Sequence, residues 1–472
     1  MSADGPADRI DPGSFRDPAG RVLHQGGRVF RLVSEYGWKN FSEVWDSGLI
    51  DDLAAAGLIL PLAEVDAAAA GNPIDTVRVF ETEKLDFISW PYEWPFSALK
   101  AAALLHLDLH LQALGRGFTL SDASAYNVQF RGARPVFIDH LSLRPYIDGE
   151  IWAGHRQFCK QFLNPLILAA SVGVMPNDWY RGAQEGLATT DLARLVPWRA
   201  KFSWNMFMHV VMQARFDRAA VAGAKVLDTK AMSKARLPKS SLIAMLNGLR
   251  NWIAKMTPPG GATVWRDYAA DNSYADSEAA HKARLVAEMI GEVKPGLVLD
   301  LGCNTGDYSA AALAAGAGRV VGFDVDFAAL EAAYARSRDQ DLDFLPLYFD
   351  AANPTPDQGW AQTERAGFAE RAQGDALLAL AFVHHLAIGR NVPLPRLVDW
   401  LIARAPHGII EFVPKADPMV QRLLALRVDI FDDYNHEAFV TAVRARAAVI
   451  SDIEISESGR RLVRYARHDG NG

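Results

Sequence analysis

The chain has 472 residues, half of them hydrophobic and 22% charged, with a formal net charge of −7. This length exceeds what one hydrophobic core usually organises, and the composition excludes a disordered chain, so two or three globular domains are expected. The negative charge argues against a surface that generally binds nucleic acid, and two cysteines, Cys159 and Cys303, exclude a disulfide framework.

Three features bear on compartment and metal content. The first twelve residues are polar and lack the apolar stretch of a secretory signal. The longest apolar run, at 162–175, is too short and too interrupted to cross a bilayer. The cysteines form no CxxC pair, so the usual zinc sites are not expected. We therefore expect a cytoplasmic protein with no membrane and no nucleic acid among its partners.

The first elements are typical of a small α+β domain. Residues 21–33 predict a hairpin around Gly26 and Gly27, because glycine readily takes the positive φ angles of tight turns. A helix is expected over about 41–56, and residues 77–89 are strand-like.

A proline-rich connection and a long helix come next. The prolines of 90-WPYEWPF-96 exclude a central strand or a helix interior. Ser97 is a candidate cap for an apolar helix that stops at Gly115 and Gly117. Helical segments rich in tryptophan, phenylalanine and methionine fill about 150–222.

The segment 119-TLSDASAYNVQFRGARPVFIDHLSL-143 carries a spacing found in phosphotransferases. Asp122 and Asn127 fit the D-x4-N catalytic loop of protein kinases and antibiotic kinases, and Asp139 follows where those folds keep a metal-binding acid. The segment therefore resembles the kinase family. The resemblance implies that Asp122 is a base and that Asn127 and Asp139 are metal ligands for Mg-ATP.

Several positions depart from the kinase pattern. Leu120 stands where the catalytic loop has histidine, and residues 140–141 replace the FG of DFG. No Gly-rich loop and no VAIK-like lysine are evident. Lys84 is out of place, and Arg28 or Arg31 would have to substitute for the missing lysine.

Three interpretations of this segment stay open. The spacing is a coincidence, with Asp122 capping a turn and Asp139 pairing with a neighbouring arginine. Alternatively it belongs to a degenerate kinase fold that serves binding, or to a working ATP site.

Residues 225–255 are basic and separate the two halves of the chain. They hold seven lysine or arginine residues against one acid, Asp228. A solvated linker with one amphipathic helix is one interpretation, and a docking site for an anionic substrate or partner is the other. PPGG at 258–261 marks the domain boundary.

After the boundary, helix and strand patterns alternate to about residue 413, which is typical of a parallel doubly wound sheet. Residues 297–301 form an apolar run suited to a buried strand, followed by the loop GCNTG and an alanine-rich helix over about 308–315. A dinucleotide would place its pyrophosphate at that helix start. Asp300 and Asp307 would repel it, whereas they suit a ligand that carries positive charge.

The run of Asp300, Gly302 and Gly306 resembles motif I of the class I S-adenosylmethionine-dependent methyltransferases. The resemblance implies that Asp324 takes both ribose hydroxyls and that Asp350 accepts from the adenine amino group. Motif I often has glycine at the place of residue 304, and asparagine tolerates the left-handed backbone better than most residues. The cofactor-binding residues that the resemblance implies are Asp300, Gly302, Cys303, Asn304, Gly306, Asp324 and Asp350.

Later segments extend the same resemblance. Residues 375–386 suggest a fourth strand ending at His384 and His385, residues 408–415 a fifth, and residues 449–467 a C-terminal hairpin across a glycine turn.

Methyl transfer to a hydroxyl would benefit from a general base. His385 and Glu411 are the catalytic candidates, although His385 could only line the pocket and Glu411 could organise the neighbouring loop. Trp265 and Tyr274 either cover the cofactor or pack.

We therefore predict an α/β enzyme in two parts. A kinase-like domain over 1–222 and a basic helical linker over 223–262 precede a methyltransferase domain with a Rossmann-like seven-stranded sheet over 263–472. The whole chain is similar to bacterial two-part methyltransferases that include a nodulation-associated protein, which implies a small-molecule or glycan acceptor. The alternatives are a phosphotransferase whose methyltransferase half is regulatory, and a non-catalytic scaffold.

Overall fold

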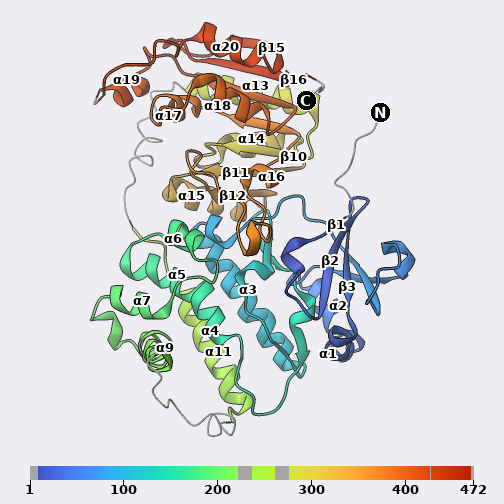
Figure 1. Cartoon of the computed structure of the whole chain (residues 1–472). Coiled ribbons are helices and arrows are strands. Elements are labelled where there is room, and N and C mark those ends of the chain that lie inside the picture. Colours follow the sequence, from blue (N-terminus) through green and yellow to red (C-terminus); the bar gives the residue numbers. More distant parts are fainter. Residues whose placement is uncertain (1–8, 222–235, 261–275, 426, 469–472) are drawn as a thin grey trace. The chain divides into compact units, whose positions relative to one another are not determined.

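A computed structural model describes most of the chain (Figure 1), namely residues 9–221, 236–260, 276–425 and 427–468. The chain forms two compact units, and each unit is made of segments that are not contiguous in the sequence. The first unit comprises residues 1–130, 134–260 and 357–365, and the second comprises residues 131–133, 261–356 and 366–472.

The first unit contains an antiparallel sheet of five strands in the order β1-β2-β3-β5-β4. Its strands are β1 (Arg9–Ile10), β2 (Gly20–Gln25), β3 (Arg28–Val33), β4 (Leu62–Val65) and β5 (Arg78–Thr82). The predicted hairpin is confirmed, with φ angles of 56° at Gly26 and 79° at Gly27. The strand expected over 77–89 is shorter, because Thr82 is the last residue of β5 with partners in β3 and β4.

The helix expected over 41–56 is two helices, α1 (Glu35–Asp46) and α2 (Leu49–Ala55). The first begins earlier than predicted because the Ser34 hydroxyl accepts a hydrogen bond from the Gly37 amide at 3.1 Å. The chain breaks at Gly48, whose φ of 71° no helix interior accommodates.

Helix α3 (Phe96–Gly115) forms the centre of the first unit and ends at the predicted glycine. The prediction that Ser97 caps it is wrong, because Pro95 occupies the cap position and Ser97 lies inside the first turn. Two short hairpin-like pairs follow, β6 (Phe118–Leu120) with β9 (Leu143–Pro145), and β7 (Val128–Arg131) with β8 (Arg134–Phe137). Among the described residues, no helix combines the length and the apolarity that crossing a bilayer requires.

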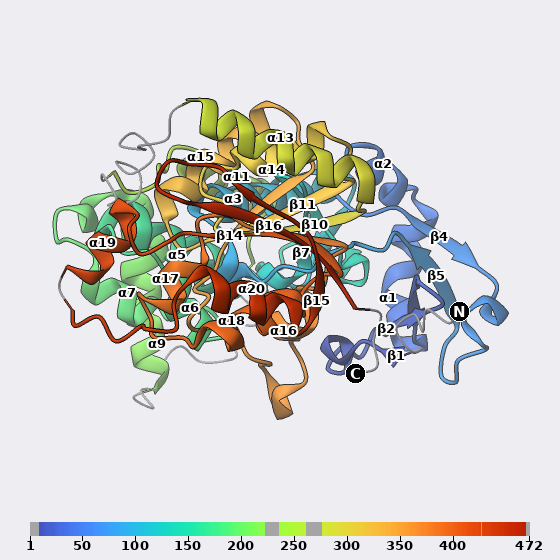
Figure 2. The same ribbon diagram turned by 90° about the horizontal axis from the view of Figure 1, so that it is seen from above.

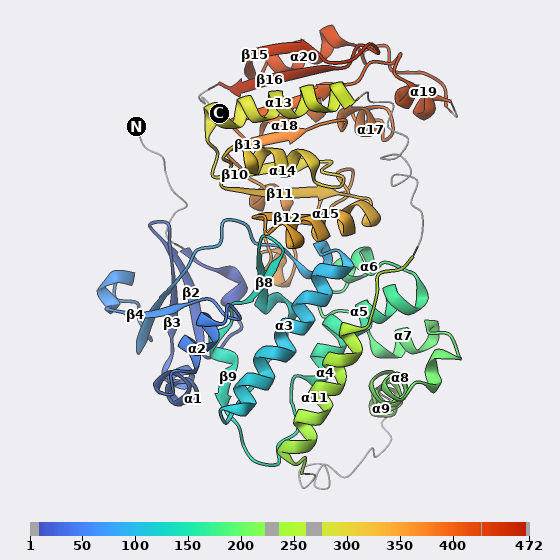
Figure 3. The same cartoon turned by 180° about the vertical axis from the view of Figure 1, so that it is seen from behind.

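The rest of the first unit is helical. Its helices are α4 (His155–Phe158), η6 (Cys159–Leu163), α5 (Asn164–Ile167), η7 (Leu168–Val172), α6 (Asn177–Gly182), α7 (Thr189–Leu195), η8 (Ala200–Phe202), α8 (Trp204–Met206), η9 (Phe207–Met212), α9 (Gln213–Val221) and α11 (Lys239–Ala254). Helix α11 lies along α3 (Figure 3), where Lys100 donates to the carbonyl of Ala254 at 2.7 Å. The amphipathic helix predicted in the basic segment is therefore docked on the unit. Residues 222–235 lie outside the described residues.

The second unit is built on a mixed seven-stranded sheet, and the predicted α/β architecture is confirmed. The strand order is β12-β11-β10-β13-β14-β16-β15, with the last two antiparallel to their neighbours. The strands are β10 (Leu297–Leu301), β11 (Arg319–Asp324), β12 (Phe344–Tyr348), β13 (Ala376–Ala379), β14 (His407–Phe412), β15 (Ala447–Glu454) and β16 (Arg461–Arg467).

Helices cover both faces of this sheet (Figure 2). Helices α13 (Asp276–Val293), α14 (Asp307–Ala314) and α15 (Phe327–Asp339) lie on one face, and α18 (Leu394–Ile402) and α20 (His436–Arg444) lie on the other. The strand order reverses at β10, whose neighbours are β11 and β13. A crevice at the carboxyl ends of the strands is expected at such a reversal, and it is where ligands of doubly wound sheets bind.

Candidate functional site

The loop after β10 is shaped by residues with left-handed backbone. Gly302, Asn304 and Gly306 have φ angles of 82°, 48° and 80°. Asn304 adopts the left-handed backbone conformation, as expected for an asparagine at this position. A Cβ atom on Gly306 would lie 2.4 Å from the Phe344 ring, so glycine is required there for packing as well as for φ.

Asp324, at the end of β11, holds this loop in place. One carboxylate oxygen accepts from the Asn304 amide at 2.8 Å, and the other accepts from the Asp326 amide at 2.9 Å. Burial raises the pKa of Asp324, and these hydrogen bonds oppose the shift. The backbone amide of Val325 also bonds this carboxylate, so amides on both sides hold it at the end of β11.

The acids at the other strand ends differ in exposure. Asp300 is buried and accepts from the Ser309 hydroxyl at 2.6 Å. Burial raises the pKa of Asp300 to about 7, the Ser309 bond opposes the shift and the charge of Asp324 adds to it. Asp350, after β12, is partly exposed and accepts from the Ala352 amide at 2.9 Å.

The charge of Asp307 is already compensated. Its carboxylate pairs with Arg336 at 2.6 Å and accepts from the Thr305 hydroxyl at 2.6 Å. Asp307 therefore contributes less to repelling an anionic ligand than the sequence suggested. Cys303 is buried beside the loop, where burial raises the pKa of its thiol.

The two histidines predicted at the end of the fourth strand lie instead in the short helix α17 (Val383–Ala387). Strand β13 ends at Ala379, and Ala381 turns the chain with a φ of 49°. His384 is fully buried, and neither ring nitrogen has a hydrogen-bond partner among the described residues. His385 is partly exposed, and burial lowers its pKa to about 4, so it is neutral at pH 7.

Glu411, on β14, belongs to a buried ion-pair network. Its carboxylate accepts from Lys282 at 2.8 Å and from the Ala381 amide at 2.8 Å. Arg460 lies 3.3 Å from the other carboxylate oxygen and also pairs with Asp417 at 2.6 Å. Two cations and an amide hold this carboxylate in place, which favours the interpretation that Glu411 organises the loop after β13.

The cationic members of this network, Lys282 and Arg460, were not predicted from the sequence. One signal was present, because Lys282 lies on the apolar stripe of α13 together with Val286 and Met289. A lysine on a buried helical face needs an acidic partner. Trp265 and Tyr274, the predicted cover of the cofactor, lie outside the described residues.

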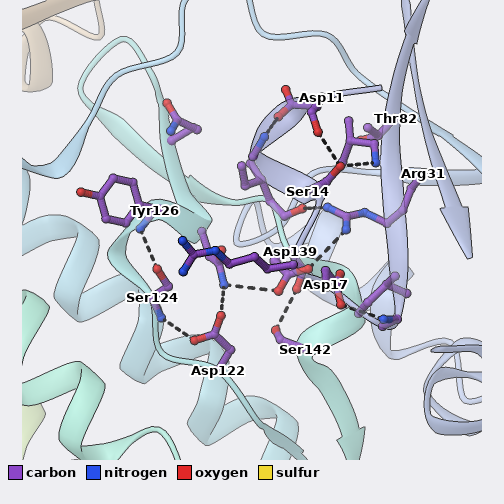
Figure 4. Close-up of a pocket in the computed structure, with 18 of the residues that line it drawn as sticks. Asp11, Ser14, Asp17, Arg31, Thr82, Asp122, Ser124, Tyr126, Asp139 and Ser142 are labelled. Atoms are coloured by element: carbon purple, nitrogen blue, oxygen red, sulfur yellow. Dashed lines mark hydrogen bonds and ion pairs between the residues drawn. The ribbon is translucent and has the colours of Figure 1, made fainter. Parts of the chain in front are cut away.

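The first unit contains a pocket of about 740 Å³. The three residues predicted from the kinase-like spacing converge on its wall (Figure 4). The Asn127 amide donates to Asp122 at 3.0 Å and to Asp139 at 3.3 Å. Two carboxylates and an amide carry the oxygen ligands that Mg²⁺ prefers, but here the amide nitrogen faces both acids, so the amide would have to turn its oxygen toward a metal.

Arg31, on β3, reaches one of these acids, Asp139. Its guanidinium lies 3.3 Å from the Asp139 carboxylate and donates to the Ile138 carbonyl at 2.9 Å. Burial raises the pKa of Asp139 to about 6, Arg31 lowers it and Asp122 raises it further. Arg28 pairs with Glu81 instead.

The contacts expected if the resemblance of this segment to kinases is a coincidence are also present. Asp122 accepts from the Ser124 amide at 3.0 Å, as a turn cap would, and Asp139 pairs with Arg31. Lys84 lines the pocket, so the lysine judged out of place in the sequence does reach it. The kinase-like assignment therefore stays a prediction.

Two residues of the pocket come from a distant part of the chain. Residues 357–365 pack as part of the first unit, and Glu364 pairs with Arg16 at 3.1 Å. The Arg365 guanidinium lies 4.6 Å from the centre of the Tyr126 ring. No local pattern predicts this approach.

Comparison with known proteins gives one relative along nearly the full length. The chain is 45% identical over 459 residues to the nodulation protein NoeA of Rhizobium meliloti strain 1021, and the alignment covers 97% of this chain and 96% of that protein. The alignment therefore includes both compact units. No protein-family profile matches the chain.

Solved structures resemble smaller parts of the chain. The N-methyltransferase NodS from Bradyrhizobium japonicum WM9 is 12% identical with a TM-score of 0.30, covering 41% of this chain and 97% of that chain. WbdD is 17% identical with a TM-score of 0.29, covering 40% of each chain. The magnesium protoporphyrin IX methyltransferase ChlM from Synechocystis PCC 6803 is 16% identical with a TM-score of 0.30, covering 47% of this chain and 95% of that chain.

Proposed function

The chain belongs to the family of the nodulation protein NoeA, and on this premise we propose that it is an S-adenosylmethionine-dependent methyltransferase. The observation that carries the proposal is the carboxyl edge of the seven-stranded sheet. There, the loop after β10 takes its shape from two glycines, and the Asn304 amide in this loop donates a hydrogen bond to Asp324 at the end of β11.

The residues at this edge fit the proposed cofactor. Asp324 offers two carboxylate oxygens, a pair that matches the vicinal hydroxyls of a ribose. Asp350 would accept from the adenine amino group, and the absence of Cβ atoms at Gly302 and Gly306 lets a ligand approach the backbone. Asp300, Cys303 and Asn304 complete the proposed cofactor-binding set. When bound, the cofactor supplies an electrophilic methyl group on its sulfonium.

The chain's own task is then to orient the acceptor and to receive a proton. We propose His385 as the general base, because it lies in α17, just beyond the carboxyl end of β13, and its partly exposed imidazole is neutral at pH 7. The lowered pKa makes it a weaker base than a free imidazole, so its role depends on close placement against the acceptor. Glu411 acts as a positioning residue that fixes the loop after β13 through the Ala381 amide. A small-molecule or glycan acceptor is proposed from the resemblance to two-part bacterial methyltransferases and from the relative's name as a nodulation protein.

Replacing Asp324 by alanine is expected to weaken S-adenosylmethionine binding by at least tenfold, or about 1.4 kcal/mol. The variant removes the proposed ribose acceptor and the partner of the Asn304 amide. Isothermal titration calorimetry measures the affinity. Asp343→Ala is the matched control. Asp343 pairs with Arg319 at the amino ends of β11 and β12, away from the proposed cofactor site, so its loss should leave the affinity for S-adenosylmethionine unchanged. Equal affinities for both variants, or no binding by the wild type, would count against the proposal.

A second candidate function is supported by the convergence of Asp122, Asn127 and Asp139. We propose that the first unit binds Mg-ATP, with Asn127 and Asp139 as magnesium ligands and Asp122 as a base. In that alternative the protein is a phosphotransferase and its methyltransferase half serves regulation.

The Asp139→Ala variant should lose Mg-ATP binding, because it removes the carboxylate proposed to hold the metal. Calorimetric titration with Mg-ATP tests this separately from the titration with S-adenosylmethionine. Asp108→Ala in the same unit removes a carboxylate that pairs with Arg250, and it should leave Mg-ATP binding unchanged. Wild-type protein that binds no Mg-ATP would end the second candidate.

A further inference from the structure

A cluster in the helical part of the first unit is not used by either proposed function. It consists of His155, Cys159 and His209, whose ligand atoms all lie within 4.8 Å of one another. The His155 Nε2 atom lies 3.2 Å from His209 Nδ1 and 3.7 Å from the Cys159 sulfur. We propose that these three side chains bind a zinc ion.

The distances match a tetrahedral zinc centre. Zn–N bonds of about 2.0–2.1 Å and Zn–S bonds of about 2.3 Å place two nitrogens about 3.3–3.4 Å apart, and a nitrogen and a sulfur about 3.5–3.6 Å apart. The observed separations of 3.2 and 3.7 Å each differ from these ranges by about 0.1 Å. A cation beside His155 Nε2 is therefore within reach of each of the other two ligands, and the ligand atoms of His209 and Cys159 lie within 4.8 Å of each other.

The local helical structure positions the ligands. His155 and Cys159 are four residues apart on the continuous helix α4–η6, so they project from the same face. His209 comes from η9, a π-helical segment, and such segments are frequent at functional sites. The Trp252 ring lies nearly parallel to the His209 ring, with centroids 6.3 Å apart.

The two imidazoles can coordinate a cation without losing a proton. Burial lowers the pKa values of His155 and His209, so both imidazoles are neutral and offer a lone pair. Cys159 is fully buried, and burial together with the nearby Asp217 raises the pKa of its thiol to about 12. A bound cation would displace the thiol proton and leave a thiolate ligand, since metal binding and deprotonation are coupled.

The donor set selects the kind of metal. Two imidazoles and one thiolate suit zinc and do not suit magnesium or calcium, which prefer oxygen. In the described part of the chain, no fourth histidine, cysteine, aspartate or glutamate joins the cluster, so the fourth position falls to water. The His-x3-Cys pair was visible in the sequence, but the third ligand is contributed by folding.

Without a metal, the same three side chains would be held by imidazole–imidazole and thiol–imidazole hydrogen bonds. The two states predict different metal contents, so the experiment starts from purified full-length protein. We expect about one zinc ion per chain by elemental analysis, and a thiolate-to-cobalt charge-transfer absorption after exchange with Co²⁺.

Cysteine variants assign the absorption to the site. The sequence has two cysteines, so Cys159→Ser should abolish the charge-transfer band while Cys303→Ser retains it. His209→Gln, which keeps a polar side chain in place, should lower Co²⁺ affinity by at least roughly tenfold, since even outer-shell changes cost that much. Circular dichroism verifies that each variant is folded.

Two results would overturn the zinc site. One is wild-type protein that contains no zinc and develops no charge-transfer band during titration with Co²⁺. The other is a band that survives in Cys159→Ser. Neither result depends on binding of S-adenosylmethionine or Mg-ATP, so the site is tested independently of the proposed functions.

Discussion

Replacing Lys282 by alanine is expected to destabilise the second unit by about 3–5 kcal/mol, the usual cost of removing one partner of a buried ion pair. Lys282 and Glu411 lie 2.8 Å apart, with side chains 2% and 0% exposed. Without the lysine, Glu411 keeps Arg460 and the Ala381 amide but loses its closest cation. Urea-induced unfolding followed by circular dichroism measures the loss of free energy.

Helix α13 offers a matched control for this variant. Arg284 is two residues away and pairs with Glu288 on the exposed surface at 3.9 Å. Exposed pairs contribute little, so Arg284→Ala should change the unfolding free energy by less than about 1 kcal/mol. If Lys282→Ala costs no more than Arg284→Ala, Glu411 is not stabilised by this lysine. The view of Glu411 as a positioning residue would then lose its main support, and its role as a base would be favoured.

The sheet of the second unit was predictable because its determinants are local. Strand β10 is covered on both faces, and such strands appear in sequence as apolar runs without alternation. The loop that follows has glycine or asparagine wherever the backbone is left-handed. The C-terminal hairpin turns at Gly459, whose φ is 85°. In each case a few adjacent residues determine the conformation.

Contacts between distant residues could not be predicted in the same way. Lys282 and Glu411 are 129 residues apart, and no spacing rule joins them. The single helix predicted over 41–56 merged the apolar stripes of two helices. Periodicity alone does not show that Gly48 takes a left-handed conformation and separates them. Ser97 has the chemistry of a cap, but the preceding proline determines where the helix begins. Residue type indicates a local role, and packing decides whether the role is used.

The pocket of the first unit also combines contacts that the sequence predicts with contacts that it does not. Asp122, Asn127 and Asp139 contact one another in the structure, because the turn and the hairpin that join them are short. The approach of Arg365 to the same pocket depends on residues 357–365 packing with the first unit, and the sequence holds no signal for that.

Replacing Gly306 by alanine is expected to lower S-adenosylmethionine affinity by at least roughly a hundredfold, or about 2.8 kcal/mol. The new Cβ atom would lie 2.4 Å from the Phe344 ring, at a residue whose φ is 80°. The loop must move to relieve this overlap, and the hydrogen bond between the Asn304 amide and Asp324 would be lost with it. Isothermal titration calorimetry and thermal unfolding give affinity and stability separately.

Gly316 separates backbone strain from the steric clash with Phe344. Its φ is 104°, and a Cβ atom there would meet nothing within 4 Å. Gly316→Ala should therefore cost roughly 1–2 kcal/mol of stability through its φ angle, with unchanged cofactor affinity. Adding Phe344→Leu to Gly306→Ala should restore part of the affinity, because neighbouring substitutions that share one contact are not additive. Equal affinities for the two glycine variants would mean that the loop after β10 does not contact the cofactor. The proposed cofactor site would then have to be abandoned even if the protein binds S-adenosylmethionine elsewhere.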